Sequence, residues 1–144
     1  MKYLTNALNY NRTIKEINIK DNEFGNQGAK YLSYILKNNN TIENLNLEHN
    51  GINNIGINYI AKSLKFNKGI NELNLSLNDF NDNNLKYLTK SMENNYVIRN
   101  IKMFECIYYN GFYYDAESQF IESLILNNRK RYNIPSFNIK NKID

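Results

Sequence analysis

One cysteine and one histidine are the most reactive side chains of this chain, and each type occurs once. A thiol and an imidazole can act as nucleophile and base, or can bind a metal ion together with further ligands. Cys106 and His49 are far apart in the sequence, and one His with one Cys supplies too few ligands for a metal site. Glu48 beside His49 is the only acid–imidazole neighbourhood, but adjacent side chains of one strand diverge. Catalysis by this pair is therefore not expected.

The short motifs that accompany enzyme sites are also missing from the sequence. It contains no Gly-rich phosphate loop and no nucleophile elbow. We therefore expect no catalytic residue, no metal site and no cofactor, and we predict that the protein is not an enzyme.

Composition sets further limits on the class of protein. The chain has 144 residues, which is one domain's worth, and its formal charge is +4. We find no apolar run of the roughly 20 residues that a membrane helix needs, and no apolar core of a signal peptide near Met1. A single cysteine fits a reducing compartment. We therefore expect a protein of the cytosol or nucleus that is not secreted and not bound to a membrane. We attribute the abundance of Asn to genome composition.

The strongest pattern in the sequence is a repeat of 28 residues. Apolar residues recur at this spacing in three columns, and a fourth column holds Asn or Cys. The columns are Ile14, Ile42, Ile70 and Ile98; Ile17, Leu45, Leu73 and Ile101; Ile19, Leu47, Leu75 and Met103; and Asn22, Asn50, Asn78 and Cys106. A fixed period of this length indicates stacked copies of one supersecondary unit.

Each copy of the repeat is predicted to contain a strand, a bend, a helix and a return loop. Apolar and polar residues alternate around Ile17 and Ile19, which predicts a short strand with one buried face. The Asn that follows can bond the backbone of a tight bend. We therefore assign a structural ladder role to the fourth column: Asn22, Asn50, Asn78 and Cys106.

The helices are predicted from apolar residues at helical spacing, such as Leu32, Leu36 and their equivalents. Before each helix, one column holds residues that predict a turn: Gly28, Gly56 and Asn84. Just ahead of these lie the expected caps: Asn26, Asn54 and Asp82. One unit cannot bury its own apolar face, whereas stacked units form a parallel sheet on the concave side and place helices on the convex side.

These motifs resemble the leucine-rich repeat family, in its ribonuclease-inhibitor-like subtype. That subtype has the pattern LxxLxLxxNxLxxxGxxxLxxxL, and residues 42–64 match it with Ile replacing Leu at several positions. The resemblance implies an α/β solenoid in a horseshoe arc of about four to five repeats. It does not imply one activity, because this scaffold hosts receptors, inhibitors, GTPase activators and ligase adaptors.

The repeat pattern extends over almost the whole chain, so we predict one domain. Residues 1–11 form a partial N-terminal repeat helix, 12–95 three regular repeats, 96–128 a fourth repeat with an insertion, and 129–144 a final strand and tail. Ile134, Phe137 and Ile139 repeat the strand spacing and predict a fifth strand over 134–140. Either the chain is a piece of a longer array, or its last elements serve as caps.

The outward-pointing strand positions are the main candidate for a binding site. Among them, five acidic residues against Lys20 and Lys102 give a charge of −3, opposite in sign to the whole chain. Complementarity then favours a protein partner with a basic patch, while an ordinary solvated face is the alternative. We predict partner binding by Glu48, His49, Glu72, Asn74, Ser76, Leu77, Lys102, Phe104 and Glu105.

Two of these residues and two further segments depart from the regular pattern. Leu77 and Phe104 replace polar residues, and Phe104 is either an anchor for a partner or packs under the insertion. The aromatic insertion at 108–116 is either an interface or a local core. The basic run at 129–131 either contacts phosphates or is a solvated loop, and nucleic acid is not the expected partner.

We therefore predict a non-enzymatic module that binds another protein on the concave face of a rigid sheet. Two other functions remain open. One is regulation of a small GTPase, which a branch of the family performs. The other is a structural fragment whose open ends stack on further repeats.

Overall fold

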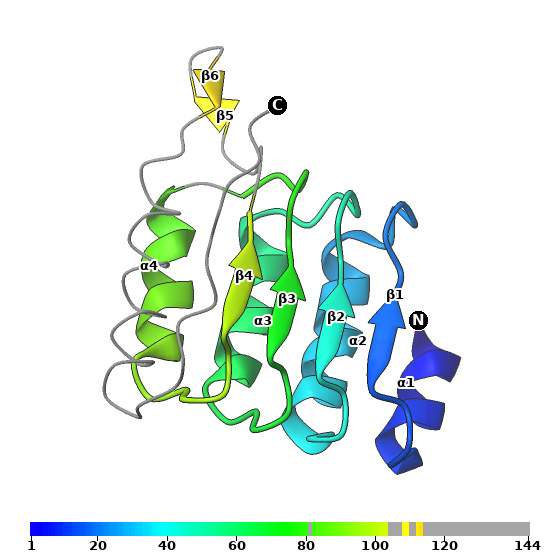
Figure 1. Ribbon diagram of the computed structural model, residues 1–144. Coiled ribbons are helices and arrows are strands. Elements are labelled where there is room, and N and C mark those ends of the chain that lie inside the picture. Colours follow the sequence, from blue (N-terminus) through cyan, green and yellow to red (C-terminus); the bar gives the residue numbers. More distant parts are fainter. Residues whose placement is uncertain (81, 104–107, 110–111, 114–144) are drawn as a thin grey trace, which may run out of the picture.

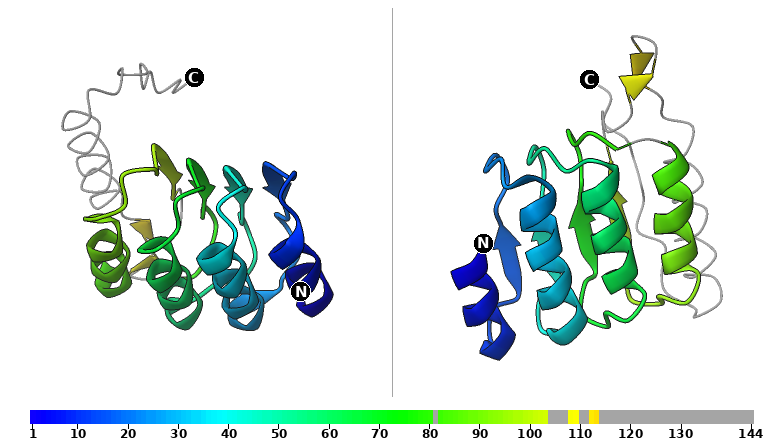
Figure 2. Two further views of the ribbon diagram at one scale, coloured as in Figure 1. Left: turned by 90° about the horizontal axis from the view of Figure 1, so that it is seen from below. Right: turned by 180° about the vertical axis from the view of Figure 1, so that it is seen from behind.

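A computed structural model describes residues 1–80, 82–103, 108–109 and 112–113 of the chain. Four strands form one parallel sheet in the order of the sequence: β1 (Glu16–Asn18), β2 (Asn44–Asn46), β3 (Glu72–Asn74) and β4 (Asn100–Lys102). Four helices lie side by side along one face of this sheet: α1 (Lys2–Tyr10), α2 (Gly25–Asn38), α3 (Asn54–Leu64) and α4 (Asp82–Met92) (Figures 1 and 2). A short antiparallel pair follows, β5 (Tyr108–Tyr109) with β6 (Phe112–Tyr113). The predicted α/β solenoid is confirmed.

The strand register follows the 28-residue period. Glu16 of β1 is the partner of Asn44 in β2, which in turn is the partner of Glu72 in β3, and Glu72 is the partner of Asn100 in β4. Equivalent residues of successive repeats therefore stand side by side, so each column of the sequence becomes a row across the sheet.

The hydrophobic core lies between the sheet and the helices. The strands contribute their inward column, in which Leu45 and Leu73 are buried, and the helices contribute residues such as Leu32, Ile60 and Leu88. Each repeat supplies about the same set of apolar residues, and neighbouring repeats cover them. This is the arrangement in which one unit is stable only through its neighbours.

The helix starts differ from the sequence prediction. Gly28 and Gly56 lie inside α2 and α3 rather than in a turn before them. Gly56 is needed for close packing, because a Cβ there would lie 2.6 Å from both Ile52 Cγ2 and Asn26 Oδ1. Asn53 caps α3 by accepting the N–H of Ile55, whereas Asn54 had been predicted as the cap. Asn26 instead serves the next repeat, since its Oδ1 accepts the N–H groups of Asn53 and Gly56.

The predicted Asn ladder joins the repeats at the ends of the strands. Asn50 Oδ1 accepts the N–H of Asn22 at 3.0 Å, and Asn78 Oδ1 accepts the N–H of Asn50 at 3.2 Å. Asn50 Nδ2 also reaches back to the carbonyl of Ile19, and Asn78 Nδ2 to that of Leu47. The ladder thus satisfies backbone groups that a buried bend would otherwise leave unpaired. Cys106, its predicted fourth member, lies outside the described residues.

A second Asn ladder, which the sequence analysis missed, runs through the return loops. Its members are again 28 residues apart: Asn11, Asn39, Asn67 and Asn95. Asn67 Nδ2 donates to the carbonyls of Leu36 and Asn39, and its Oδ1 accepts the N–H groups of Gly69 and Ile70. Asn39 and Asn95 repeat the same four bonds one unit earlier and one unit later. These Asn residues are structural parts of the fold rather than a result of composition.

Candidate partner-binding face

The sheet face opposite the helices carries two rows of side chains, and we call it the open face. One row consists of the first strand positions: Glu16, Asn44, Glu72 and Asn100. The other consists of the third positions: Asn18, Asn46, Asn74 and Lys102. A groove of about 460 Å³ runs across both rows and all four strands. None of the described helices lies on this face (Figure 2).

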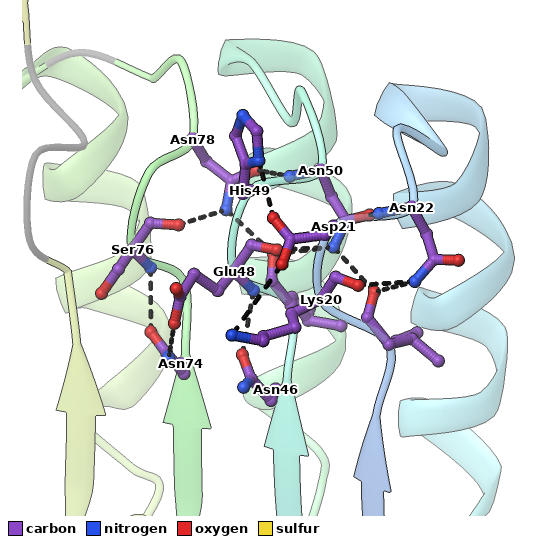
Figure 3. A network of polar contacts seen from close by, with 12 residues as sticks. Lys20, Asp21, Asn22, Asn46, Glu48, His49, Asn50, Asn74, Ser76 and Asn78 are labelled. Atoms are coloured by element: carbon purple, nitrogen blue, oxygen red, sulfur yellow. Dashed lines mark hydrogen bonds and ion pairs between the residues drawn. The ribbon is translucent and has the colours of Figure 1, made fainter.

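Hydrogen bonds hold the second row in place. Asn18, Asn46 and Asn74 each accept the backbone N–H two residues further on, at 3.3, 3.0 and 3.0 Å. These bonds end the strands, because each N–H is turned toward a side chain instead of toward a neighbouring strand. Asn74 Nδ2 also donates to Glu48 Oε2 at 2.7 Å (Figure 3). The amide side chains therefore present their groups in fixed positions.

The first row places acidic groups between amides. Asn44 Nδ2 donates to Glu16 Oε1 at 3.2 Å. Within the described part of the chain, no side chain or backbone N–H donates to the exposed Glu72 carboxylate. Glu72 is thus an available acceptor near the middle of the groove, and Lys102 at the end of the neighbouring row is exposed.

The residues just after the strands form a further row with an unusual backbone. Asp21, His49 and Leu77 have φ angles of 56°, 50° and 55°, in the left-handed region that side chains other than Asn and Asp seldom adopt. The residue types at these positions do not predict this conformation, and the sequence predicted only that these side chains point outward. The shared 28-residue spacing of the three positions was the only available signal.

His49 pairs with a residue of the preceding repeat rather than with Glu48. Its Nδ1 lies 2.7 Å from Asp21 Oδ1, and both side chains are exposed (Figure 3). The Glu48 carboxylate points instead toward Asn74, as the Glu48–Asn74 bond shows. The pair therefore lies at the rim of the open face, where it can contribute to recognition of a partner.

The predicted site residues have different environments. Glu72, Lys102, His49 and Leu77 are exposed, and Glu48 and Asn74 are half-buried. Ser76 was predicted to point outward but is buried. Glu48 makes the equivalent backbone bonds one repeat earlier and is half-buried, so the burial of Ser76 follows from its shorter side chain. Phe104 and Glu105 lie outside the described residues, as do the predicted fifth strand and the basic run at 129–131.

Charge is distributed unequally between the two sides of the molecule. Among the described outward positions, four acidic residues (Glu16, Asp21, Glu48 and Glu72) stand against Lys20 and Lys102, a formal charge of −2. The helices α1 to α4 contain Lys2, Lys30, Lys37, Lys62, Lys86 and Lys90 against Asp82, a formal charge of +5. The open face, together with the residues that directly follow its strands, is therefore the acidic side of a basic protein.

The described residues contain neither a cluster of metal-binding side chains nor a membrane-spanning helix. His, Cys, Asp and Glu side chains nowhere gather there in a group of three or more that could hold a metal ion. None of the helices that the structure describes has the length and apolar content required to cross a membrane.

Comparison with known proteins supports the repeat assignment. Residues 10–33 and 38–61 each match the family model described as Leucine Rich repeat. The structure is similar to that of leiomodin-1 actin-binding site 2, with a TM-score of 0.73 and 21% identity over 90% of this chain and 72% of that one. It is also similar to the tropomodulin C-terminal domain from Caenorhabditis elegans, with a TM-score of 0.59 and 12% identity over 92% and 95% of the two chains. No curated protein matches the sequence. The fold is thus a leucine-rich repeat solenoid, and the ribonuclease-inhibitor-like subtype remains a prediction.

Proposed function

We propose that this chain is a non-enzymatic protein-interaction module that binds a polypeptide partner on its open face. The observation that carries the proposal is the groove across β1 to β4, in which Asn18, Asn46 and Asn74 are held by hydrogen bonds before any partner arrives. Preorganised side chains lose little conformational entropy on binding, so more of the contact energy becomes affinity.

A protein partner suits the dimensions of this surface better than a small molecule. Four strands about 4.8 Å apart span only about 14 Å. The groove is open rather than enclosed, and both polar and apolar residues line it. A stable protein interface covers about 800 Å² on each side. The partner must therefore extend beyond the groove onto the row of Asp21, His49 and Leu77. Leu77 is 39% exposed and supplies an apolar contact at this rim.

The charge of the open face favours a partner with a basic patch. Glu16 and Glu72 stand two strands apart, and Asp21 and Glu48 lie at the rim on the same side. Charges of this kind set the association rate and the register of a complex more than its final affinity.

Reversal of two charges tests this proposal on a partner purified from the native source. The double variant Glu16→Lys, Glu72→Lys is expected to lower the association rate about tenfold and to weaken the dependence of binding on salt. Stopped-flow or surface-based kinetics at two salt concentrations measures both effects. Glu93→Lys, an exposed residue beyond α4, is the matched control and should leave the rate unchanged. Equal losses in both variants would contradict binding at the open face.

A second candidate function is actin binding. The observation that favours it is the similarity to leiomodin-1 actin-binding site 2, which extends over 90% of this chain. At 21% identity this similarity concerns the fold, so the contact residues must be found in this sequence itself.

Purified monomeric actin provides a direct test of this candidate. If the chain binds actin through the open face, calorimetry should give a measurable Kd that the Glu16→Lys, Glu72→Lys variant changes and Glu93→Lys does not. No heat of binding with about 100 μM of each protein would limit the interaction to weaker than about 5.5 kcal/mol and remove actin as the partner.

A further inference from the structure

The first repeat exposes a core column that every later repeat covers. Ile14 is 40% exposed, whereas its equivalents Ile42, Ile70 and Ile98 are 1%, 0% and 4% exposed. Ile17 and Ile19 of the same repeat are likewise only half-buried, although their equivalents in the second and third repeats are buried. The first repeat lacks, in the described structure, the neighbouring strand that protects the others.

The backbone of β1 is also open along one edge. Lys15 accepts the N–H groups of Glu43 and Asn44, and Ile19 donates to Asn46, so the odd-numbered residues bond toward β2. In a parallel ladder, alternate residues bond to opposite neighbours. The N–H and C=O groups of Glu16 and Asn18 therefore face away from β2. On that side no described strand follows, because β1 is an edge strand of the sheet (Figure 1).

The strand-end Asn ladder stops at the same edge. Asn50 Oδ1 accepts the N–H of Asn22, but among the described residues nothing donates to Asn22 Oδ1. Asn50 Nδ2 reaches the carbonyl of Ile19 in the preceding repeat, whereas Asn22 Nδ2 bonds only to carbonyls of its own repeat. The exposed Ile14, the backbone edge of β1 that no described strand pairs with and the end of the Asn ladder at Asn22 thus lie at the same end of the molecule. This end is also next to α1, which packs on α2.

We propose that this end binds residues 134–140 of a second copy of the chain, which add to β1 as a parallel strand. This segment lies outside the described residues, and its sequence carries the motif: Ile134, Phe137 and Ile139 have the spacing of Ile14, Ile17 and Ile19. Beside β1, these three side chains would cover Ile14, Ile17 and Ile19, in the way that β3 covers β2. The proposal is independent of what binds the open face.

The position of Pro135 agrees with this register. Pro135 aligns with Lys15 and Glu43, the residue just after the first apolar position. Toward the following strand, Lys15 uses only its carbonyl, which accepts from Glu43 and Asn44. A strand added before β1 therefore needs the carbonyl of Pro135 and not an N–H, which proline lacks. Phe137 and Ile139 would supply the N–H groups, as Ile17 and Ile19 do toward β2.

Self-association of the full chain is the test, measured by sedimentation velocity over a range of concentrations. The wild type should form species larger than its 17.0 kDa monomer as concentration rises. Ile14→Glu places a charge in the binding end, and Phe137→Asp places one in the added strand; each alone should remain monomeric. In a mixture of the two variants, residues 134–140 of the Ile14→Glu protein can still bind β1 of the Phe137→Asp protein. The mixture should therefore give a 1:1 dimer and nothing larger.

Controls distinguish this interaction from nonspecific hydrophobic association and from misfolding. Ile55→Glu makes the same substitution at an isoleucine that is 60% exposed on α3, and it should associate like the wild type. Circular dichroism of each variant should show an unchanged fold. At about 1 mM protein, association with a Kd below about 1 mM would be detected. A wild type that stays monomeric up to this concentration overturns the proposal. Association that survives either Ile14→Glu or Phe137→Asp overturns it as well.

Discussion

Replacing Asn67 by alanine is expected to lower the free energy of unfolding by about 4 kcal/mol, because four buried backbone groups lose their partner at once. The side chain is fully buried and joins two successive return loops. The carbonyls of Leu36 and Asn39 lose a donor, and the N–H groups of Gly69 and Ile70 lose an acceptor. Such a loss is a large share of the 5–15 kcal/mol that is typical of whole domains.

Denaturant unfolding measures this effect, and hydrogen exchange locates it. Amide exchange should accelerate at Gly69 and Ile70 in the Asn67→Ala protein. The matched control is Asn38→Ala, at an exposed Asn whose Nδ2 bonds only within α2, and it should change stability by less than about 0.5 kcal/mol. Equal effects of the two substitutions would show that the second ladder does not support the fold.

Alanine at Ile42 is expected to cost about 3–4 kcal/mol, whereas alanine at Ile14 should cost about 1 kcal/mol or less. The two residues occupy the same column of the repeat, but Ile42 is 1% exposed and Ile14 is 40% exposed. Removal of the buried side chain leaves a cavity, while the exposed one loses only part of its contacts.

The comparison uses one substitution at two equivalent positions, so differences in residue type cannot explain the result. Thermal and denaturant unfolding of both variants should be recorded at low protein concentration, where self-association through β1 does not add stability. Similar losses at both positions would contradict the finding that burial in this column depends on the preceding repeat.

The repeat period predicted the architecture because equivalent residues must stack when a unit cannot bury itself. Ile42, Leu45 and Leu47 reach the core as expected, and the Asn22, Asn50 and Asn78 column forms its ladder. The period does not report which polar residues are structural. Asn67 was therefore missed, although its 28-residue spacing from Asn39 and Asn95 was visible in the sequence.

The candidate site was harder to predict than the core. Alternation continues one residue beyond the strands, to Leu47 and Leu75, and the chain turns into the left-handed conformation at Asp21, His49 and Leu77. Beyond that turn, alternation along the sequence no longer predicts whether a side chain points to the core or to the solvent. This turn explains why His49 meets Asp21 of another repeat rather than its neighbour Glu48. Ser76 precedes the turn and is buried because its side chain is shorter than those of Lys20 and Glu48 at the same position.

Site-specific photo-crosslinking is the most direct test of whether a protein partner occupies the open face. A photoreactive side chain would replace Asn46, at the middle of the groove, or Lys62, which is exposed on α3. Both proteins would be expressed in the native source and irradiated there. If a protein binds the open face, position 46 should give a discrete protein adduct and position 62 none. Adducts from position 62 alone, or the same adducts from both positions, would contradict partner binding at this face.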